Sequence, residues 1–477
     1  MELIWNSAVF VLVTLLSVVA SAHAILTKRD PRAAVSWVAL LWLVPFFGAL
    51  LYLLLGINRI HRRASRLGRP AVAYQEPVLP ISQHALQEML GPGREHFGEL
   101  AEAVDRVSDH RLVGGNEVLP LANGEQAYPE MLRAIGQAQR SVTLSTYIFG
   151  SDAVGRQFMQ ALRAAVGRGV EVRVLIDNAG ERYSWPSAVN TLRRMGVPVS
   201  RFYPGLLPRQ VLGLNLRNHR KLLVVDGRVG FTGGMNLRVH HLAESGRRRA
   251  TRDLHFRIEG PVVRQLQDVF VEDWTFCTGE YLEGPAFFPV LEPRGNVMAR
   301  GVPGGPDESL GRLHWTLHAA IHAAHRSIRV VTPYFLPDTT LVSALNLAVL
   351  RGVAVDIVLP GHNNLPYVQW AMMAHLWQVM ELGCRVWLTP GPFDHTKLML
   401  VDDVWTFIGS MNWDPRSLRL NFEFNCECYG PELVYSLESF VQGRRREARE
   451  ITMRDLDRRN IVRKLRDGLA RLLMPYL

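Results

Sequence analysis

Residues 219–226 read His219-Arg220-Lys221-Leu222-Leu223-Val224-Val225-Asp226, and Gly233-Gly234-Met235-Asn236 follows after six further residues. A second copy reads His395-Thr396-Lys397-Leu398-Met399-Leu400-Val401-Asp402 and is followed, at the same distance, by Gly409-Ser410-Met411-Asn412. Both copies fit the pattern His-x-Lys-x4-Asp-x6-Gly-(Gly/Ser)-x-Asn. Because five positions agree at equal spacing in the two copies, the repeat is far more specific than a single short motif.

Each copy predicts a β-hairpin. His219 and Lys221 alternate as on one face of a strand, and the apolar run that follows is typical of a buried strand. Asp-Gly at 226–227 and Asp-Asp at 402–403 predict turns, after which a second short strand brings Gly-x-Asn back beside the first. We therefore expect one end of each hairpin to present a His, a Lys and an Asn.

Two imidazoles, two ammonium groups and two amides suit a phosphodiester substrate. One histidine can attack phosphorus and the other can protonate the leaving oxygen, while lysine and asparagine side chains stabilise the charge that builds on the phosphoryl oxygens. No cysteine or carboxylate cluster has metal-ligand spacing, so we expect neither a metal nor another cofactor. The candidate catalytic residues are His219, Lys221, Asp226, His395, Lys397 and Asp402, and the candidate phosphate-binding residues are Asn236 and Asn412. For the two aspartates, bracing of the turn and direct chemistry are both open.

Lysine usage supports a role for both motifs. Of 54 basic residues, the only lysines are Lys28, Lys221, Lys397 and Lys464, and the rest are arginine. Half of the lysines therefore lie in the two motifs, where a compact ammonium group replaces the planar guanidinium that this chain otherwise prefers.

The two halves of the chain repeat one order of predicted elements. Helices are predicted near 128–140, 155–167, 187–195, 313–325, 340–350 and 367–382, and strands over 141–149, 170–177, 327–335 and 353–359. Thr146-Tyr147 matches Thr332-Pro333-Tyr334, and Arg168-Gly169-Val170 matches Arg351-Gly352-Val353. This alternation predicts an α/β fold with mainly parallel sheets flanked by helices. Two halves related by a pseudo-twofold axis would contribute one His and one Lys each to a single site.

The N-terminus predicts two transmembrane helices. From about Leu3 to Leu26 the chain has no charge except His23, and the run from 33 to 57 has none, so that each is long enough to cross a bilayer, with Pro45 expected to kink the second. A cleaved signal peptide is the alternative, but the first seven residues contain no Lys or Arg. Five arginines between 59 and 69 outnumber the three basic residues of the connecting loop, which favours a cytoplasmic catalytic region.

The composition adds limits on partners and domains. A net charge of +10 indicates an acidic partner, and the membrane segments favour an anionic lipid surface over nucleic acid. The four cysteines are too sparse for a disulfide framework or a zinc site. We expect two transmembrane helices over 1–57, a linker over 58–115, the two halves over 116–290 and 291–440, and an Arg-rich helical tail over 441–477 that packs on the catalytic region. The arginines of this tail are interpreted as a solvated helix face, with binding to anionic headgroups as the alternative.

The double motif resembles that of the phospholipase D superfamily, and within it the chain resembles bacterial cardiolipin synthases over nearly its whole length. The residues that carry this second resemblance are Asp30-Pro31, Trp37, Leu214 to Lys221, Thr332 to Asp338, Gly409 to Ser417, Asn421-Phe422-Glu423 and Arg471 to Leu477. The resemblance implies a phosphatidyltransferase of the bacterial inner membrane that joins two phosphatidylglycerol molecules. It also implies that His219 is the nucleophile and His395 the general acid, and that Asp253 and Glu423 orient the two imidazoles.

The chain departs from the family pattern after Asn236, where Leu237-Arg238-Val239-His240-His241 replaces an acidic and an aromatic residue, and at Thr251, where the family usually has Trp. We expect His240 and His241 to be surface residues. A hydrolase that releases phosphatidic acid, a nuclease of the same superfamily and a catalytically inactive membrane scaffold are the alternative functions. Acyl-chain preference and oligomeric state do not follow from the sequence.

Overall fold

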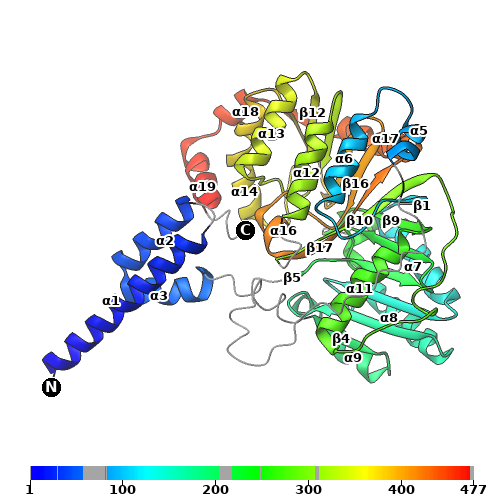
Figure 1. The fold of residues 1–477 in the computed structure, drawn as a ribbon, viewed down its shortest axis with the longest axis horizontal. Helices are drawn as coiled ribbons and strands as arrows, with labels where there is room; N and C mark the ends of the chain where they lie inside the picture. Colours follow the sequence, from blue (N-terminus) through cyan, green and yellow to red (C-terminus); the bar gives the residue numbers. More distant parts are fainter. Residues whose placement is uncertain are drawn as a thin grey trace. The chain divides into compact units, whose positions relative to one another are not determined.

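The computed structural model describes residues 2–28, 31–56, 81, 83–202, 217–247, 249–306 and 311–472 (Figure 1). The chain divides into two compact units, Met1–Gly68 with Gly205–Asn215, and Arg69–Pro204 with Leu216–Leu477. Several parts of the chain lie outside the described residues. Among them are the arginines at 59–69, residues 58–80 of the expected linker (58–115), and the chain end at 473–477.

The first unit contains the apolar N-terminal helices. Helix α1 (Glu2–Thr27) is followed by α2 (Pro31–Leu43), α3 (Pro45–Leu51) and the π-helical turn η1 (Tyr52–Gly56). Ala24, Leu41, Ala49 and Tyr52 form the small core between these elements. In the described part of the chain, one helix has the length and composition to cross a membrane, over Phe10–Thr27.

The second predicted span is interrupted rather than merely kinked. Helix α2 ends at Leu43, Val44 leaves the helical conformation with φ −136° and ψ 69°, and a new helix begins at Pro45. Proline lacks the N–H needed for the helical hydrogen bond, and its ring clashes with the preceding turn. The expectation that the second apolar run forms one transmembrane helix with a kink at Pro45 is therefore not confirmed, because the helix breaks at Val44.

The second unit is built on one large mixed sheet. Its strands follow the order β18-β13-β12-β11-β15-β16-β17-β10-β1-β9-β7-β6-β2-β3-β4. The strands of the first half are β1 (Val113–Ala122), β2 (Ser141–Thr146), β3 (Glu171–Asp177), β4 (Val199–Phe202), β6 (Leu222–Val225), β7 (Val229–Gly233) and β9 (Leu254–Glu259). Those of the second half are β10 (Val297–Gly304), β11 (Ser327–Val331), β12 (Ala354–Pro360), β13 (Arg385–Thr389), β15 (Leu398–Val401), β16 (Trp405–Gly409), β17 (Asn421–Tyr429) and β18 (Arg449–Ile451).

The two halves have the same topology. Read outward from the centre, the first half runs β1-β9-β7-β6-β2-β3-β4 and the second runs β10-β17-β16-β15-β11-β12-β13, with β18 added at the edge. The central strands β1 and β10 pair antiparallel, with Val113 opposite Ala299. An antiparallel seam between two copies of one strand order relates the halves by a pseudo-twofold axis.

The predicted α/β class is confirmed, but the expectation of mainly parallel sheets is wrong. Parallel pairing joins β2 to β3 to β4 and β11 to β12 to β13. The central strands and both motif hairpins pair antiparallel. The prediction failed because four long antiparallel strands, β1, β9, β10 and β17, were not recognised in the sequence.

Helices cover both faces of the sheet, as Figure 1 shows for α7, α11, α12 and α17. One face carries α7 (Asn123–Gln137), α8 (Ala153–Gly167) and α9 (Ala188–Arg194) in the first half, and α5 (Gln83–Leu90), α6 (His96–Asp105), α12 (Arg312–Ala323), α13 (Thr339–Leu350), α14 (Pro366–His375) and α15 (Trp377–Met380) in the second. The other face carries α11 (Val263–Thr278) and α17 (Pro431–Glu447) over a core shared by both halves. Cys426 and Cys428 lie in this shared core as free thiols.

The ends of the catalytic unit differ from the expected linker and helical tail. In the region expected as a linker, α5 and α6 contribute to the core of the second half. After α17, the tail forms the edge strand β18, the short helix α18 (Met453–Asp457) and α19 (Ile461–Leu472). Arg444 pairs with Asp394 at 2.8 Å, and Arg445 lies 4.5 Å over the Trp387 ring, so this part of the tail is not a solvated helix face.

Candidate active site

The two motif hairpins are present and bring their open ends together. Strands β6 and β7 form one hairpin and β15 and β16 the other. His219 and Lys221 lie just before β6, and Asn236 follows β7; His395, Lys397 and Asn412 take the same places around β15 and β16. Each histidine thus lies at the end of its hairpin opposite the turn.

Two short parallel pairings cross between the halves and set the position of each histidine. Strand β5 (Arg217–Asn218) pairs with the start of β17, so that the backbone N–H of His219 donates to Phe422 O at 2.8 Å. Strand β14 (Phe393–Asp394) pairs with β8 (Thr251–Arg252), and His395 N donates to Arg252 O at 2.8 Å. The next residue on each partner strand is a carboxylate. The crossing strands therefore place each histidine beside a carboxylate from the opposite half.

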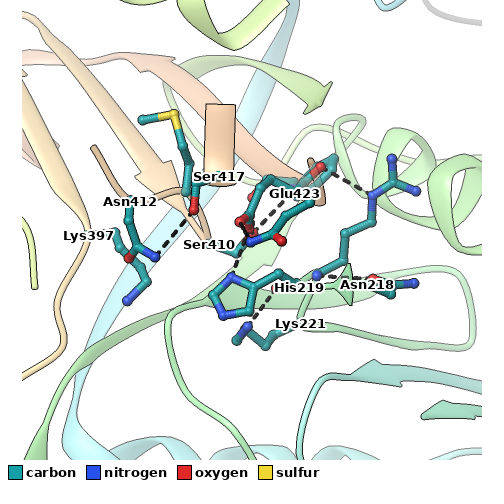
Figure 2. A network of polar contacts seen from close by, with 12 residues as sticks. Asn218, His219, Lys221, Lys397, Ser410, Asn412, Ser417 and Glu423 are labelled. Atoms are coloured by element: carbon teal, nitrogen blue, oxygen red, sulfur yellow. Dashed lines mark hydrogen bonds and ion pairs between the residues drawn. The ribbon is translucent and has the colours of Figure 1, made fainter. Parts of the chain in front are cut away.

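The side chains complete these crossed pairs. His219 Nδ1 lies 3.0 Å from Glu423 Oε2, and His395 Nδ1 lies 2.8 Å from Asp253 Oδ2 (Figure 2 shows the first pair). A carboxylate at Nδ1 orients the ring and leaves Nε2 as the nitrogen that a substrate can reach. All four side chains are almost fully buried.

The two lysines lie between the histidines. Lys221 Nζ donates to His219 O and Lys397 Nζ to His395 O, both at 2.6 Å, and Lys397 Nζ also lies 3.0 Å from His395 Nδ1. Burial lowers the pKa of Lys221 to about 7, with a further lowering by Lys397, and burial lowers the pKa of Lys397 to about 8. Two buried ammonium groups in one site favour an anion at this place.

The two asparagines are not equivalent. Asn236 Oδ1 accepts the backbone N–H of Ile148 at 3.0 Å, which leaves its Nδ2 for another acceptor. Asn412 Nδ2 instead donates to Ser417 Oγ at 3.3 Å (Figure 2). The two asparagines therefore differ: the contact with Ser417 engages one of the two amide N–H groups of Asn412, whereas Asn236 is held through its amide oxygen.

The motif aspartates lie at the far ends of the hairpins, away from the histidines. Asp226 accepts backbone N–H groups of residues 139–141 at 2.7–3.2 Å, and Asp402 accepts those of residues 325–327 at 2.8–3.1 Å. Both have a left-handed backbone with φ 53°. This geometry supports bracing of the turn against the strand beside it, and it does not bring either aspartate to the other candidate catalytic side chains.

The two carboxylates differ in their surroundings. Burial alone would raise the pKa of Glu423, but the charge and hydrogen bond of His219, with Lys221 and Ser410, bring it below its ordinary value. Burial raises the pKa of Asp253 to about 8 against the pull of Lys397. The position of Ser410 is a glycine in the first motif, and a Cβ on Gly234 would lie only 2.3 Å from Asp253 Oδ1. The half-sites are therefore chemically distinct.

His241 was expected at the surface, and that expectation is wrong. Its side chain is 1% exposed, its Nε2 lies 3.3 Å from the backbone N of Asn236, and its Nδ1 lies 3.8 Å from the Asp253 oxygen that holds His395. His240 is partly exposed. No sequence pattern indicated the burial of His241, because it lies in a short segment without periodicity.

Two tyrosines lie at the site, although their matching positions in the two halves were interpreted only as evidence for the repeat. The Tyr147 ring lies 5.3 Å from the His219 ring and 5.7 Å from Lys221 Nζ. The Tyr334 ring lies 6.3 Å from the His395 ring. Each tyrosine follows the equivalent strand of its half, β2 or β11, and this repetition in the sequence could have indicated that both belong to the site.

The comparisons with known proteins agree with this geometry. A family model described as "Cardiolipin synthase, PLD-like domain" matches residues 131–274 and 317–443, which contain both motifs. The chain belongs to this family of the phospholipase D superfamily. It is accordingly an enzyme of the phosphatidyltransferase class. A second model, "Phospholipase_D-nuclease N-terminal", matches residues 15–56.

Related proteins match this chain over nearly its full length. A cardiolipin synthase of Geobacillus kaustophilus (strain HTA426) is 31% identical over 459 residues, which are 95% of this chain and 90% of that one. A cardiolipin synthase A of Pseudomonas putida (strain W619) is 31% identical over 467 residues, 98% of this chain and 97% of that one. A phosphatidylserine synthase structure from Haemophilus influenzae Rd KW20 has a TM-score of 0.60 at 14% identity, covers 80% of this chain and 100% of that chain, and shares the fold.

Proposed function

We propose that the chain is a cardiolipin synthase that transfers a phosphatidyl group from one phosphatidylglycerol to a second, releasing glycerol, without a metal or other cofactor. The observation that carries this proposal is the crossed pair of histidine–carboxylate contacts around two buried lysines. One nucleophile, one proton donor and two cations around a common centre are what a two-step phosphoryl transfer needs. The names of the relatives suggest cardiolipin as the product.

In the first step, His219 Nε2 attacks the phosphorus of a phosphatidylglycerol. The bond from phosphorus to the glycerol oxygen breaks, and His395 gives its Nε2 proton to that oxygen, so that glycerol leaves and a phosphatidyl-histidine forms. Glu423 stabilises the positive charge that develops on the His219 ring, since it stays anionic at neutral pH.

In the second step, a glycerol hydroxyl of another phosphatidylglycerol is the acceptor. His395, now neutral, takes the hydroxyl proton, the oxygen attacks phosphorus, and the phosphorus–nitrogen bond breaks to regenerate His219. Lys221, Lys397 and Asn236 bind the phosphoryl oxygens in both steps, where loss of one such donor typically costs about 3–4 kcal/mol of transition-state stabilisation.

The substrate itself supplies the protonation state that the first step requires. In the empty site, burial and the lysine charges hold the pKa of His395 well below its usual value. A bound phosphodiester places a negative charge between the lysines, which offsets their effect and favours the imidazolium form of His395. Substrate binding therefore shifts His395 toward its charged, acid form.

We place the enzyme in the bacterial cytoplasmic membrane with its catalytic unit in the cytoplasm. Helix α1 is long and apolar enough to cross, and the segment 31–56 supplies a second crossing with a break at Val44. Its 26 residues would extend about 39 Å as helix, more than the thickness of a hydrocarbon core. The arginines at 59–69 support the cytoplasmic orientation.

The test is a product analysis of the full chain in detergent, with phosphatidylglycerol labelled in its headgroup glycerol and a chelator present. We expect cardiolipin and one released glycerol for each cardiolipin formed, and no product with His395→Ala. Phosphatidic acid as the sole lipid product would identify a hydrolase. Absence of turnover in the folded wild-type protein would favour the inactive scaffold.

A further inference from the structure

Helix α19 is amphipathic, but its apolar face points away from the protein. Its exposed side chains are Ile461 (67%), Val462 (70%), Leu465 (61%), Leu469 (66%) and Leu472 (71%). At 3.6 residues per turn these five lie within an arc of about 100°. A helix on the surface of a soluble domain normally turns such a stripe toward the core. In α19 the apolar stripe is exposed instead, where it can contact an apolar environment outside the protein.

The outward orientation of α19 is fixed by contacts on its opposite side. Asp467 and Ala470 are buried there, and Asp467 Oδ2 pairs with Arg459 Nη1 at 2.7 Å. Arg459 also donates to Met373 O at 3.0 Å, and Arg471 donates to Ala374 O at 3.3 Å. These bonds attach α19 to α14 by polar and small residues (Figure 1 shows the two helices side by side). The leucines are therefore not available to the core.

The borders of the apolar stripe are basic. Arg466 lies along one border, and Lys464 and Arg471 lie along the other, while Arg463 lies on the side of the helix opposite the stripe. The one acidic residue of the helix, Asp467, is already paired with Arg459 and Arg466. Arg466 also lies over the Trp370 ring at 4.5 Å, which directs its stem along the helix surface. An apolar stripe between cations matches the interface of an anionic bilayer.

We propose that α19 docks in the interface of an anionic membrane, with its five exposed apolar side chains in the acyl-chain boundary and its basic borders at the headgroups. The apolar stripe accounts for insertion, and the cations select anionic lipid. A second copy of the chain would place three border cations against three border cations across such a stripe, so the charge favours lipid as the occupant.

Docking of α19 would bring the side of the active site that carries Tyr334 toward the lipid. Helix α14, which carries α19, starts just after Asn364, and Asn364 Oδ1 accepts the hydroxyl of Tyr334 at 2.9 Å. Tyr334 in turn lies beside His395. The docking itself is independent of the reaction, whereas this consequence for substrate access rests on the proposed function.

The test places a polarity-sensitive fluorophore at Leu465→Cys in the full chain, reconstituted into nanodiscs. Cys277→Ser provides the background, because the other three native cysteines are buried. Discs contain phosphatidylcholine alone or with phosphatidylglycerol, and brominated lipids report contact with acyl chains. The matched control is Tyr435→Cys, which is 78% exposed on α17, on the opposite face of the sheet.

We expect blue-shifted emission and quenching by brominated lipid at position 465 in anionic discs, and neither at 435. Since each basic residue near an anionic surface strengthens binding about fivefold, Lys464→Gln should weaken docking about fivefold. Equal, weak quenching at 465 and 435 would contradict the proposal. A blue shift without lipid quenching would also contradict it, because a second copy or the N-terminal helices would then cover the stripe.

The docking readout separates this proposal from the proposed function. Quenching requires no turnover and should persist in His395→Ala. Leu465→Asn with Leu469→Asn should raise the KM for phosphatidylglycerol in bilayers severalfold and leave kcat with a soluble short-chain phosphatidylglycerol unchanged. Intact quenching in a protein without transferase activity would overturn the proposed function alone.

Discussion

At the scale of single residues, the site depends on histidine–carboxylate contacts. The residue types suggest such contacts, but the partners are too far apart in the sequence to be paired from it. The motif histidines and lysines follow from the repeated pattern, and Asp253 and Glu423 follow from the family resemblance. The crossing of Asp253 to His395 and of Glu423 to His219 did not follow, because the residues of each pair are separated by 142 and 204 positions. His241 was missed because burial in an irregular segment leaves no periodic signal.

The position of His241 predicts a role in holding Asp253. The Asn236 N–H directed at Nε2 fixes the proton on Nδ1, which faces the Asp253 oxygen at 3.8 Å. His241→Ala should therefore lower kcat about tenfold or more and shift the alkaline limb of the pH profile, since the charge of Asp253 loses a neighbouring donor. His240→Ala, one residue away and partly exposed, is the control and should change neither. Identical profiles for the two variants would refute the role of His241.

The lysines predict a pH dependence of anion binding. As pH rises from about 7 to 9, Lys221 and Lys397 lose their protons and Asp253 becomes charged, so the site loses positive charge. Affinity for glycerophosphoglycerol, whose single negative charge stays constant over this range, should fall by up to about tenfold per pH unit for each proton taken up on binding. Calorimetry in buffers of different ionisation enthalpy should show proton uptake at pH 8. A flat affinity from pH 6.5 to 9 would show that these groups do not titrate at the site.

At the scale of elements, strands with a clear pattern were predicted and strands with polar or irregular sequences were not. Strands β2, β3, β11 and β12 are apolar runs bounded by turns, and their positions agree with the prediction within a few residues. Strand β1 contains Gly114, Gly115 and Pro120, residues that argue against a strand. Strand β17 contains charged side chains that are nevertheless buried, because partners such as Arg300 neutralise Glu427. Such pairings lie outside what local sequence conveys.

The turn aspartates predict an effect on stability without an effect on chemistry. Asp402 accepts three backbone N–H groups while its side chain is 2% exposed. Asp402→Ala should lower the free energy of unfolding by about 2–4 kcal/mol, because these donors lose their acceptor. Asp403→Ala removes only half-exposed ion pairs with Arg94 and Arg326 and should cost about 1 kcal/mol or less. Thermal unfolding in detergent measures both. An Asp402→Ala protein of native stability that has lost turnover would instead indicate direct chemistry.

At the scale of the whole molecule, the duplicated fold makes one site out of two halves. The identical strand order and the antiparallel seam of β1 and β10 bring both hairpin ends together, and the short crossing strands exchange the carboxylates. Duplication and a shared site could be predicted from the repeat. The mixed sheet could not, since the antiparallel central strands are the poorly patterned ones. The apolar N-terminal runs were recognised, and Pro45 indicated a kink in the second, which the structure shows as a complete break at Val44.

The crossed pairing predicts that a substitution in one half disables the histidine of the other. Glu423→Gln should slow formation of the intermediate on His219 about a thousandfold, because the imidazole loses its orienting carboxylate. Asp253→Asn should act on the steps assigned to His395. Single-turnover kinetics with a phosphatidyl p-nitrophenyl ester separates the two, since nitrophenolate leaves without acid assistance. A Glu423→Gln burst as fast as that of the wild type would contradict the crossed arrangement.

The same ester provides the most direct test of a phosphatidyl-histidine intermediate on His219. In His395→Ala, we expect a burst of about one nitrophenolate per active site, because the second step lacks its base. Mass spectrometry after a neutral quench should detect a phosphatidyl adduct on the peptide that contains His219. His219→Ala should give no burst and no adduct. A burst in His219→Ala with the adduct on the peptide of His395, or nitrophenolate release without any adduct, would rule out His219 as the nucleophile.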